Sequence, residues 1–332
     1  MKNFIYILIA SMLFLSCKQT YQEESGSVFH TLYQVKYKSD TLLTDKIKAE
    51  LKAFDLSLNP FNSKSIVSKV NRNEDVEVDQ WFTEVFNKSM EVSEKSGGMF
   101  DVTVAPLINL WGFGFEQWDS ISAHTIDSLK SFVGYRKVRL QGGRVVKDDP
   151  RIILNFSAIA KGYSCDVIAA LLEREGVNDY MVEIGGEVVT KGKNARGECW
   201  NIAIKKPENE VDYTPMKDTV IVQLCQKSGM ATSGNYINYV IKDGKRYGHT
   251  IDPFTGYPSE QNILSATIIA PDCMTADAYA TAFMAMGVEA ACRMATQIPD
   301  LEYYLYYLGD DGKMRVKISD NFALRILRIY GN

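Results

Sequence analysis

Histidine and cysteine are scarce in this 332-residue sequence, which has three histidines, six cysteines and no C-x-x-C pair. Their wide spacing excludes a zinc ribbon or zinc finger, whose ligands recur at short fixed intervals. After position 17 the number of cysteines is odd, which argues against a disulfide framework. We therefore expect most of the remaining five to be small buried apolar residues: Cys165, Cys199, Cys225, Cys273 and Cys292.

Positive charge is not in excess either. The chain has 37 Lys and Arg against 41 Asp and Glu, a net charge of −4 and a pI near 5.6. A nucleic-acid partner needs clustered positive charge, so we exclude one. The content of 46% hydrophobic and 23% charged residues is that of an ordinary globular protein. The length suits one large domain or two closely packed ones.

No apolar run is long enough to cross a bilayer, which takes about 20 helical residues. The run 4–15 is almost entirely apolar and follows a basic start, a pattern typical of a secretory signal. Ser16 and Cys17 then resemble a bacterial lipobox. We predict a signal peptide over 1–16, lipidation of Cys17 and a polar tether over 17–27. The protein would be exported and lipid-anchored, on the periplasmic side of a bacterial membrane. The alternatives are an ordinary secretory signal cut nearby or a short membrane anchor.

Strand-like and helix-like patterns are mixed without strict alternation, which favours an α+β fold with mixed sheets and packed helices. Helical spacing of Ile47, Leu51 and Phe54 predicts a helix over 44–58. Further helices are expected at 79–96, 125–132, 160–175, 275–286 and 288–296. Strands are expected at 28–37, 136–140, 144–147, 152–156, 180–184, 188–192, 200–205, 219–224, 236–241, 265–270 and, as the final one, 301–308, with a turn at 231–235.

Asp277 and Thr281 stand four residues apart in the helix expected at 275–286, and so share one face. A carboxylate and a hydroxyl form a hard-oxygen pair suited to Mg²⁺, which usually takes one or two protein carboxylates and fills its shell with water or phosphate. The alternative is structural. Thr275 could cap the helix, and Asp277 could be a first-turn acid that complements the helix dipole.

The run NFSAIAKGY (155–163) is a second candidate site, in which small residues follow a strand and a helix begins near Lys161. A cation and unpaired N–H groups at a helix start suit a phosphate. The alternative is a solvated lysine in a strand-to-helix turn.

Several shorter motifs contain turn residues. In HTIDPFTG (249–256), Asp-Pro followed by Gly signals a turn, and His249 could be structural or catalytic. The runs GGE (185–187) and ATSGNY (231–236) are glycine-bearing turns where backbone can approach a ligand closely. The run GMFDVTVAPL (98–107) could be a strand entry in which an acid caps a turn.

Taken in order, these segments resemble the ApbE family of FAD:protein FMN transferases over roughly 27–287. The most specific runs are NFSAIAKGY, GGE, ATSGNY, HTIDPFTG and TADAYAT (275–281). The resemblance implies one ApbE-like, T-fold-related domain over 28–332. It also implies a Mg²⁺-dependent enzyme that moves FMN from FAD to a Thr or Ser hydroxyl of an acceptor protein and releases AMP. The acceptor that the family suggests is a membrane electron-transfer subunit.

The resemblance also implies roles for individual residues. Asp277 and Thr281 match the family's metal-binding acid and hydroxyl, and Ala158 matches a position whose backbone carbonyl binds the same ion. His249 or Asp252 could deprotonate the acceptor hydroxyl. The positions that match FAD contacts are Phe61, Met99, Phe100, Asp101, Asn155, Lys161 and Ile251.

Two positions depart from the family's pattern. Asn155 stands where many members carry Asp, which removes a negative charge but keeps a hydrogen-bonding group. Phe29, His30 and Thr31 replace Met-Gly-Thr, and a histidine side chain could crowd the approach of backbone to ligand. Two alternatives for the activity stay open. One is hydrolysis of FAD to FMN and AMP by water, and the other is FAD binding by a non-catalytic lipoprotein.

Overall fold

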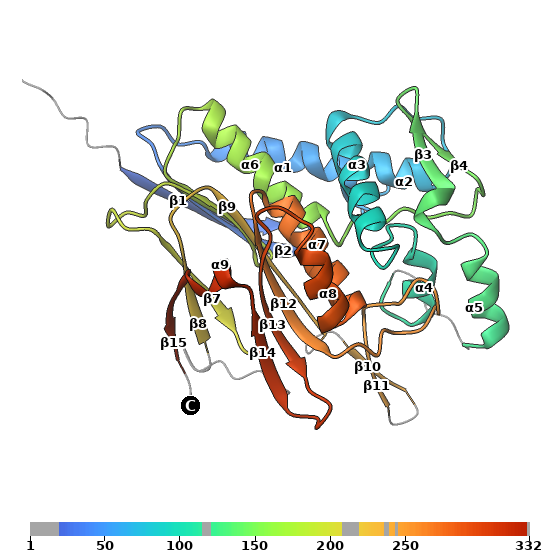
Figure 1. The fold of residues 1–332 in the computed structure, drawn as a ribbon. Helices are drawn as coiled ribbons and strands as arrows, with labels where there is room; N and C mark the ends of the chain where they lie inside the picture. The colour runs from blue at the N-terminus through green and yellow to red at the C-terminus, as the bar shows by residue number, and fades with distance from the viewer. Residues whose placement is uncertain (1–19, 115–120, 208–218, 236–238, 243–244, 331–332) are drawn as a thin grey trace, which may run out of the picture.

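The computed structural model describes residues 20–114, 121–207, 219–235, 239–242 and 245–330. Its centre is an eight-stranded sheet in the order β1-β2-β5-β6-β9-β12-β13-β14, with every neighbouring pair antiparallel (Figure 1). The α+β fold predicted from the sequence is confirmed. The strands of this sheet are β1 (Tyr21–Val28), β2 (Thr31–Lys38), β5 (Tyr180–Ile184), β6 (Glu187–Lys191), β9 (Ser228–Gly234), β12 (Ile263–Ala270), β13 (Glu302–Leu308) and β14 (Met314–Ile318).

Helices pack on one face of the central sheet (Figure 1). Helix α6 (Ala160–Arg174) contacts β5 and β6, α7 (Cys273–Met286) contacts β9 and β12, and α1 (Thr44–Leu58) packs against α6. No helix within the described residues is both long and apolar enough to span a membrane. The other helices are α2 (Ile66–Asn71), α3 (Gln80–Lys95), α4 (Ala105–Leu110), α5 (Ala123–Lys130), α8 (Val288–Ala295), α9 (Asp320–Ala323) and the 3₁₀ turn η1 (Tyr135–Lys137).

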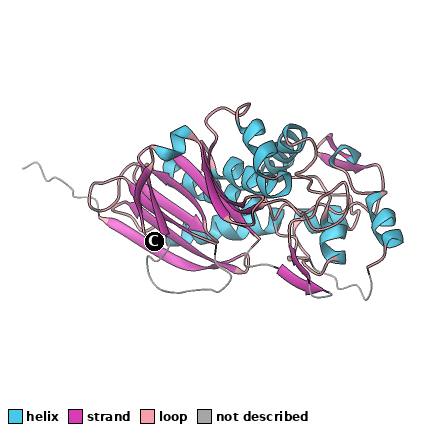
Figure 2. Cartoon of the chain, turned by 60° about the horizontal axis from the view of Figure 1, so that its bottom comes forward, coloured by secondary structure: helices cyan, strands magenta, loops and turns pink. Residues whose placement is uncertain are grey.

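A smaller sheet covers part of the opposite face. It consists of β15 (Ile326–Ile329), β8 (Thr219–Leu224) and β7 (Trp200–Lys205), in that order. Successive side chains of β12 point to opposite faces, so Ile268 joins the core under the helices and Ile269 joins the cluster with the small sheet. The hairpins β3 (Val138–Gln141) with β4 (Arg144–Lys147) and β10 (Tyr239–Lys242) with β11 (Lys245–Gly248) stand apart from both sheets (Figure 2).

Helix α7 is buried on nearly all sides, as expected for a helix that is apolar all round. It lies close to α6 because Gly162 has no side chain. A Cβ at position 162 would lie 2.3 Å from the carbonyl oxygen of Cys273 and 2.7 Å from Cβ of Asp277. This close approach brings the start of α6 to the face of α7 that carries Asp277.

The N-terminal part of the domain begins earlier than predicted. Residues 21–28 form β1, not a polar tether, because they pair along their whole length with β2. The strand expected over 28–37 is broken at Phe29 and His30, whose φ values of 50° and 59° form a two-residue turn. Tight hairpin turns of this kind need positive φ at their central residues. The predicted signal peptide and Cys17 lie outside the described residues.

Three other secondary-structure predictions are wrong. Residues 231–235 are not a turn, because 228–234 form β9 between β6 and β12. Residues 152–156 form no strand, since the backbone N–H and C=O of Leu154 pair with the side chain of Asn71 instead. The chain also continues beyond β13 into β14, α9 and β15. Of the strand expected at 236–241, residues 239–241 lie in β10 and 236–238 lie outside the described residues.

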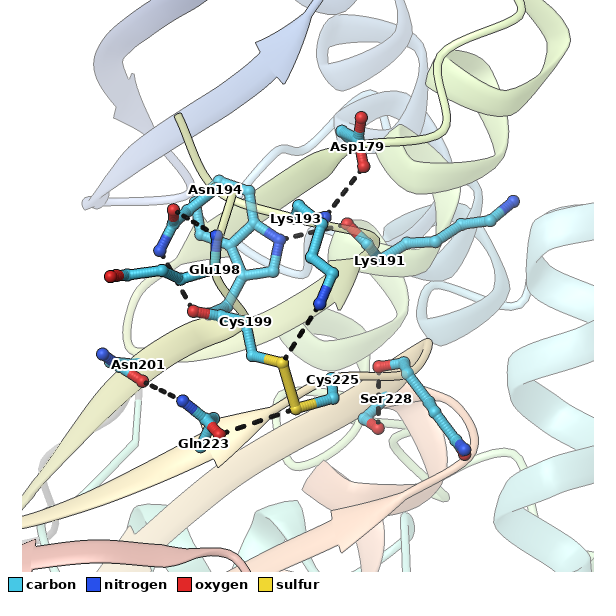
Figure 3. The surroundings of a disulfide bond; sticks show 12 residues. Asp179, Lys191, Lys193, Asn194, Glu198, Cys199, Asn201, Gln223, Cys225 and Ser228 are labelled. Atoms are coloured by element: carbon cyan, nitrogen blue, oxygen red, sulfur yellow. Dashed lines mark hydrogen bonds between the residues drawn. A yellow bond between two sulfur atoms is a disulfide. The ribbon is translucent and has the colours of Figure 1, made fainter. Parts of the chain in front are cut away.

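Cys199 and Cys225 form a disulfide, which corrects the prediction that no disulfide framework is present (Figure 3). Cys199 precedes β7 and Cys225 follows β8. The cross-strand pair next to them joins Trp200 and Leu224, so the strand register places the two cysteines opposite each other. Cys165 and Cys273 are buried thiols, but Cys292 is only partly buried, so the prediction that most of the five cysteines are small buried residues is wrong.

Candidate active site

A cavity of about 660 Å³ lies where α6 and α7 meet the loops beside the central sheet. Its volume is in the range of ordinary ligand and cofactor sites. Segments far apart in the sequence line it, and they carry most of the predicted site residues. Those lining the cavity are Phe61, Met99, Phe100, Asp101, Asn155, Ala158, Lys161, His249, Ile251, Asp277 and Thr281.

The Asp277 carboxylate is 3% exposed and lies at the junction of α7 with α6. Its Oδ2 accepts a hydrogen bond from the backbone N–H of Gly162 at 2.9 Å. Burial raises the pKa of Asp277, and the nearby Lys161 ammonium and the Gly162 N–H lower it by less. A cation in the cavity would offset the cost of keeping this buried carboxylate ionised.

The structural alternative for this helix start is wrong. Asp272, not Thr275, caps α7, and its side chain accepts the backbone N–H of Thr275 at 2.7 Å. Because α7 begins at Cys273, Asp277 lies beyond the first turn. Thr281 follows one turn later, and its hydroxyl lies 3.3 Å from that of Ser233 on β9.

Lys161 and Glu187 form an ion pair at the cavity wall. Burial lowers the pKa of Lys161, but the carboxylates of Glu187 and Asp277 raise it by more, so the net pKa is raised and the lysine stays charged. Glu187 is the first residue of β6 and is 3% exposed. The GGE run predicted only a glycine turn, so Glu187 was not among the predicted site residues. Its one signal was an acid directly after two glycines.

Asp101 lines the cavity, but both of its carboxylate oxygens bind groups of the protein. Oδ1 accepts the backbone N–H and the hydroxyl of Thr103 at 2.7 and 2.6 Å, and Oδ2 accepts the backbone N–H of Tyr135 at 2.8 Å. Burial raises the pKa of Asp101, and these hydrogen bonds lower it by less. The carboxylate therefore fixes the loop that carries Met99 and Phe100 to the cavity.

The two positions that depart from the family pattern differ in their relation to the cavity. Asn155 lines the cavity, and its Oδ1 accepts the backbone N–H of Ser157 at 2.8 Å. Phe29, not His30, lines the cavity, and the His30 ring packs edge-on against Phe61 with 5.4 Å between centroids. The structure therefore does not support the prediction that His30 crowds the ligand. Its φ of 59° explains why glycine suits that position.

The positions of His249 and Asp252 favour different roles for the two residues. The His249 ring lines the cavity and lies edge-on to Phe113, with 6.3 Å between centroids. Asp252 is not among the described residues that line the cavity. Its Oδ1 accepts the backbone N–H groups of Phe254 and Thr255 at 2.8 and 3.1 Å, which closes the turn that the sequence predicted. The geometry therefore leaves His249 as the candidate base.

A sequence profile described as the ApbE family matches residues 29–305. The chain belongs to the ApbE family. An FAD:protein FMN transferase of Haemophilus influenzae is 34% identical over 334 residues, which cover 94% of this chain and 95% of that protein. One of Escherichia coli is 31% identical over 333 residues, 93% of each chain. The solved structure of a flavin transferase ApbE from Vibrio cholerae matches with a TM-score of 0.82 at 31% identity, covering 92% of this chain and 99% of that one.

Membership of the ApbE family makes this chain an enzyme of flavin transfer, in agreement with the resemblance noted from the sequence. The family's fold is retained as well, since an ApbE protein of Thermotoga maritima matches with a TM-score of 0.78 at 28% identity, covering 93% of this chain and 100% of that one.

The residues present fit the hard divalent cation that the ApbE resemblance implies. Asp277, Thr281 and Ala158 line one cavity and offer a carboxylate, a hydroxyl and a backbone carbonyl. Within the described residues no three or more His, Cys, Asp or Glu side chains gather around one point. Mg²⁺ needs no such group, because it takes one or two carboxylates and completes its shell with water or phosphate.

Proposed function

We propose that this chain transfers FMN from FAD to a Thr or Ser hydroxyl of an acceptor protein, releases AMP and depends on Mg²⁺. The observation that supports this most is the convergence of Asp277, Thr281, Lys161 and His249 on one cavity from three separate segments. Aromatic side chains of the same cavity, Phe61 and Phe100 among them, suit the flavin or adenine ring of the substrate.

The polar residues of the cavity suit a pyrophosphate. The Asp277 carboxylate, the Thr281 hydroxyl and the Ala158 carbonyl would hold the cation. When bound, Mg²⁺ supplies a Lewis acid that stabilises charge on phosphoryl oxygens. The Lys161 ammonium, kept charged by its acidic neighbours, binds phosphate oxygens by charge and hydrogen bonding.

The transfer step is a displacement at phosphorus. The acceptor hydroxyl oxygen bonds to the phosphorus of the FMN half, the bond from that phosphorus to the bridging oxygen breaks, and AMP leaves with the electron pair. His249 takes the hydroxyl proton on an unprotonated ring nitrogen. Catalysis of this kind depends mainly on positioning and charge stabilisation, which the loop held by Asp101 and the α6–α7 contact provide.

One experiment separates transfer from hydrolysis. The purified protein is incubated with FAD and MgCl₂, with and without the membrane proteins of its source cell, and AMP and protein-bound FMN are measured. Transfer predicts FMN on a Thr or Ser and AMP release that depends on the acceptor. AMP release at the same rate without acceptor would identify an FAD pyrophosphatase instead. Intact FAD in both samples would support a non-catalytic FAD-binding protein.

We further propose that the protein is exported and lipid-anchored through Cys17, where it meets a membrane electron-transfer subunit as acceptor. The Cys199–Cys225 disulfide supports export, because disulfides persist in oxidising compartments and are rare in the cytosol. Metabolic labelling with a fatty acid tests the anchor. Label on the wild-type protein that is lost in C17S supports it, and an unlabelled wild-type protein contradicts it.

A further inference from the structure

Glu187 has one carboxylate oxygen that the contacts of the fold leave unused. Its Oε1 pairs with the Lys161 ammonium. Its Oε2 is buried and has no hydrogen-bond partner within the described part of the chain. A buried acceptor without a partner costs free energy, and such atoms in native proteins commonly face a water, an ion or a ligand.

This oxygen lies next to Gly185, at the wall of the cavity. Glu187 lines it, as does Gly185, and a Cβ built on Gly185 would lie 3.3 Å from Glu187 Oε2. Asp277 on α7 also lines the cavity. Lys161, which pairs with Glu187, directly precedes Gly162, whose N–H binds Asp277, so the two carboxylates lie near each other. When both carboxylates are ionised, they and the one ammonium give this part of the cavity one net negative charge.

We propose that Glu187 supplies the second carboxylate of the cation site. Its unpaired Oε2 would enter the shell of the ion directly or through one water, from the β6 side, facing Asp277 from α7. Two carboxylates on one small divalent ion is the upper end of what Mg²⁺ takes in proteins. The pairing of Oε1 with Lys161 then fixes the carboxylate and holds the phosphate-binding lysine next to the ion. The inference rests on the cation site of the proposed function.

The test measures cation binding by the FAD-free protein, with Mn²⁺ as the probe and the free ion followed by electron paramagnetic resonance. E187Q keeps the size of the side chain and removes its charge. It should weaken Mn²⁺ binding at least about tenfold, the loss usual for outer or shared ligands of a metal. The matched control is E183Q on the neighbouring strand β5. Glu183 lies outside the cavity lining, so E183Q should bind Mn²⁺ as the wild type does.

A second variant guards against a folding defect in E187Q. K161M removes a positive charge beside the cation site, so it should tighten Mn²⁺ binding several-fold. Wild-type Mn²⁺ affinity in both E187Q and K161M would overturn the inference. If D277N loses Mn²⁺ while E187Q retains it, the cation site of the proposed function stands and the role of Glu187 falls. If the wild-type protein binds no Mn²⁺, both fall.

Discussion

The buried carboxylate of Asp277 accepts the backbone N–H of Gly162 at 2.9 Å, and this contact joins the two helices on which the site depends. Gly162 directly follows Lys161, so the hydrogen bond sets the candidate cation ligand of α7 beside the candidate phosphate ligand of α6. The absence of a side chain at Gly162 permits the approach. One backbone hydrogen bond therefore sets the position of the candidate cation ligand relative to the candidate phosphate ligand.

G162A should disrupt this arrangement. The added Cβ would meet the Cys273 carbonyl at 2.3 Å and Asp277 Cβ at 2.7 Å, so the helices must move apart. Overpacking of a buried contact costs about 1–3 kcal/mol. We expect a lower melting temperature and weaker Mn²⁺ binding in the same variant. A stable G162A protein with wild-type Mn²⁺ affinity would show that the close approach is not needed.

Asp166 on α6 should make stability depend on pH. Its carboxylate accepts the N–H groups of Cys273 and Met274 at the start of α7, at 3.0 and 2.8 Å. Burial and the nearby Asp272 carboxylate raise the pKa of Asp166 to about 7. The folded protein therefore keeps this proton between about pH 4, where an unfolded Asp releases it, and pH 7. Its contribution to stability is complete below that window and is lost as pH rises through it.

D166N removes this titration. The melting temperature of the wild type, relative to that of D166N, should fall as pH rises from about 4 to 7 and then level off. Ionisable groups that do not interact with Asp166 affect both proteins alike. D127N, which changes an exposed acid on α5, should keep the wild-type slope. Parallel curves for wild type and D166N would contradict the assigned pKa.

The Cys199–Cys225 disulfide should stabilise the small sheet without affecting the cavity, whose lining contains neither cysteine. It spans a sequence separation of 26 residues, for which the chain-entropy model gives about 3.5 kcal/mol. The double variant C199S/C225S should melt lower than the wild type and retain FAD and Mn²⁺ binding. C292S, which changes a free cysteine, should melt as the wild type does. Equal melting temperatures for the wild type and the double variant would show that no stabilising bond forms.

Substitutions of His249 and Asp252 should have different effects in kinetic assays. H249Q removes the candidate base, so kcat for transfer should fall about 10²–10⁴-fold while KM for FAD changes little. D252N removes an acceptor of two backbone hydrogen bonds in the turn, so it should lower the melting temperature more than kcat. A larger kcat loss in D252N than in H249Q would reverse the assignment.

Much of the fold follows from local patterns in the sequence. Helix α1 matches its predicted bounds because its apolar residues recur at helical spacing, and α3 begins after the predicted boundary residue Asp79, which caps it. Strand β9 was missed because Thr-Ser-Gly suggests a turn, although here small residues let the strand lie against α7. A Cβ at Gly229 would lie 2.2 Å from the backbone nitrogen of Cys273. That reason exists only in the tertiary structure.

Some residues of the site could likewise be predicted from the sequence, and others could not. Asp277, Thr281 and Lys161 were predicted because each belongs to a specific motif, and the fold brings them to one cavity. Glu187 was missed because its meaning depends on its pairing with Lys161, 26 residues away. The disulfide was missed for a similar reason, since it depends on the register of β7 and β8.

The most direct test of the account measures FMN transfer to an acceptor protein by D277N. Purified acceptor is incubated with FAD, with or without Mg²⁺, and its intact mass is recorded after reaction with the wild type, D277N or D127N. The account predicts that the wild type and D127N add FMN to the acceptor only when Mg²⁺ is present, and that D277N adds none. FMN transfer by D277N with unchanged Mg²⁺ dependence would contradict it.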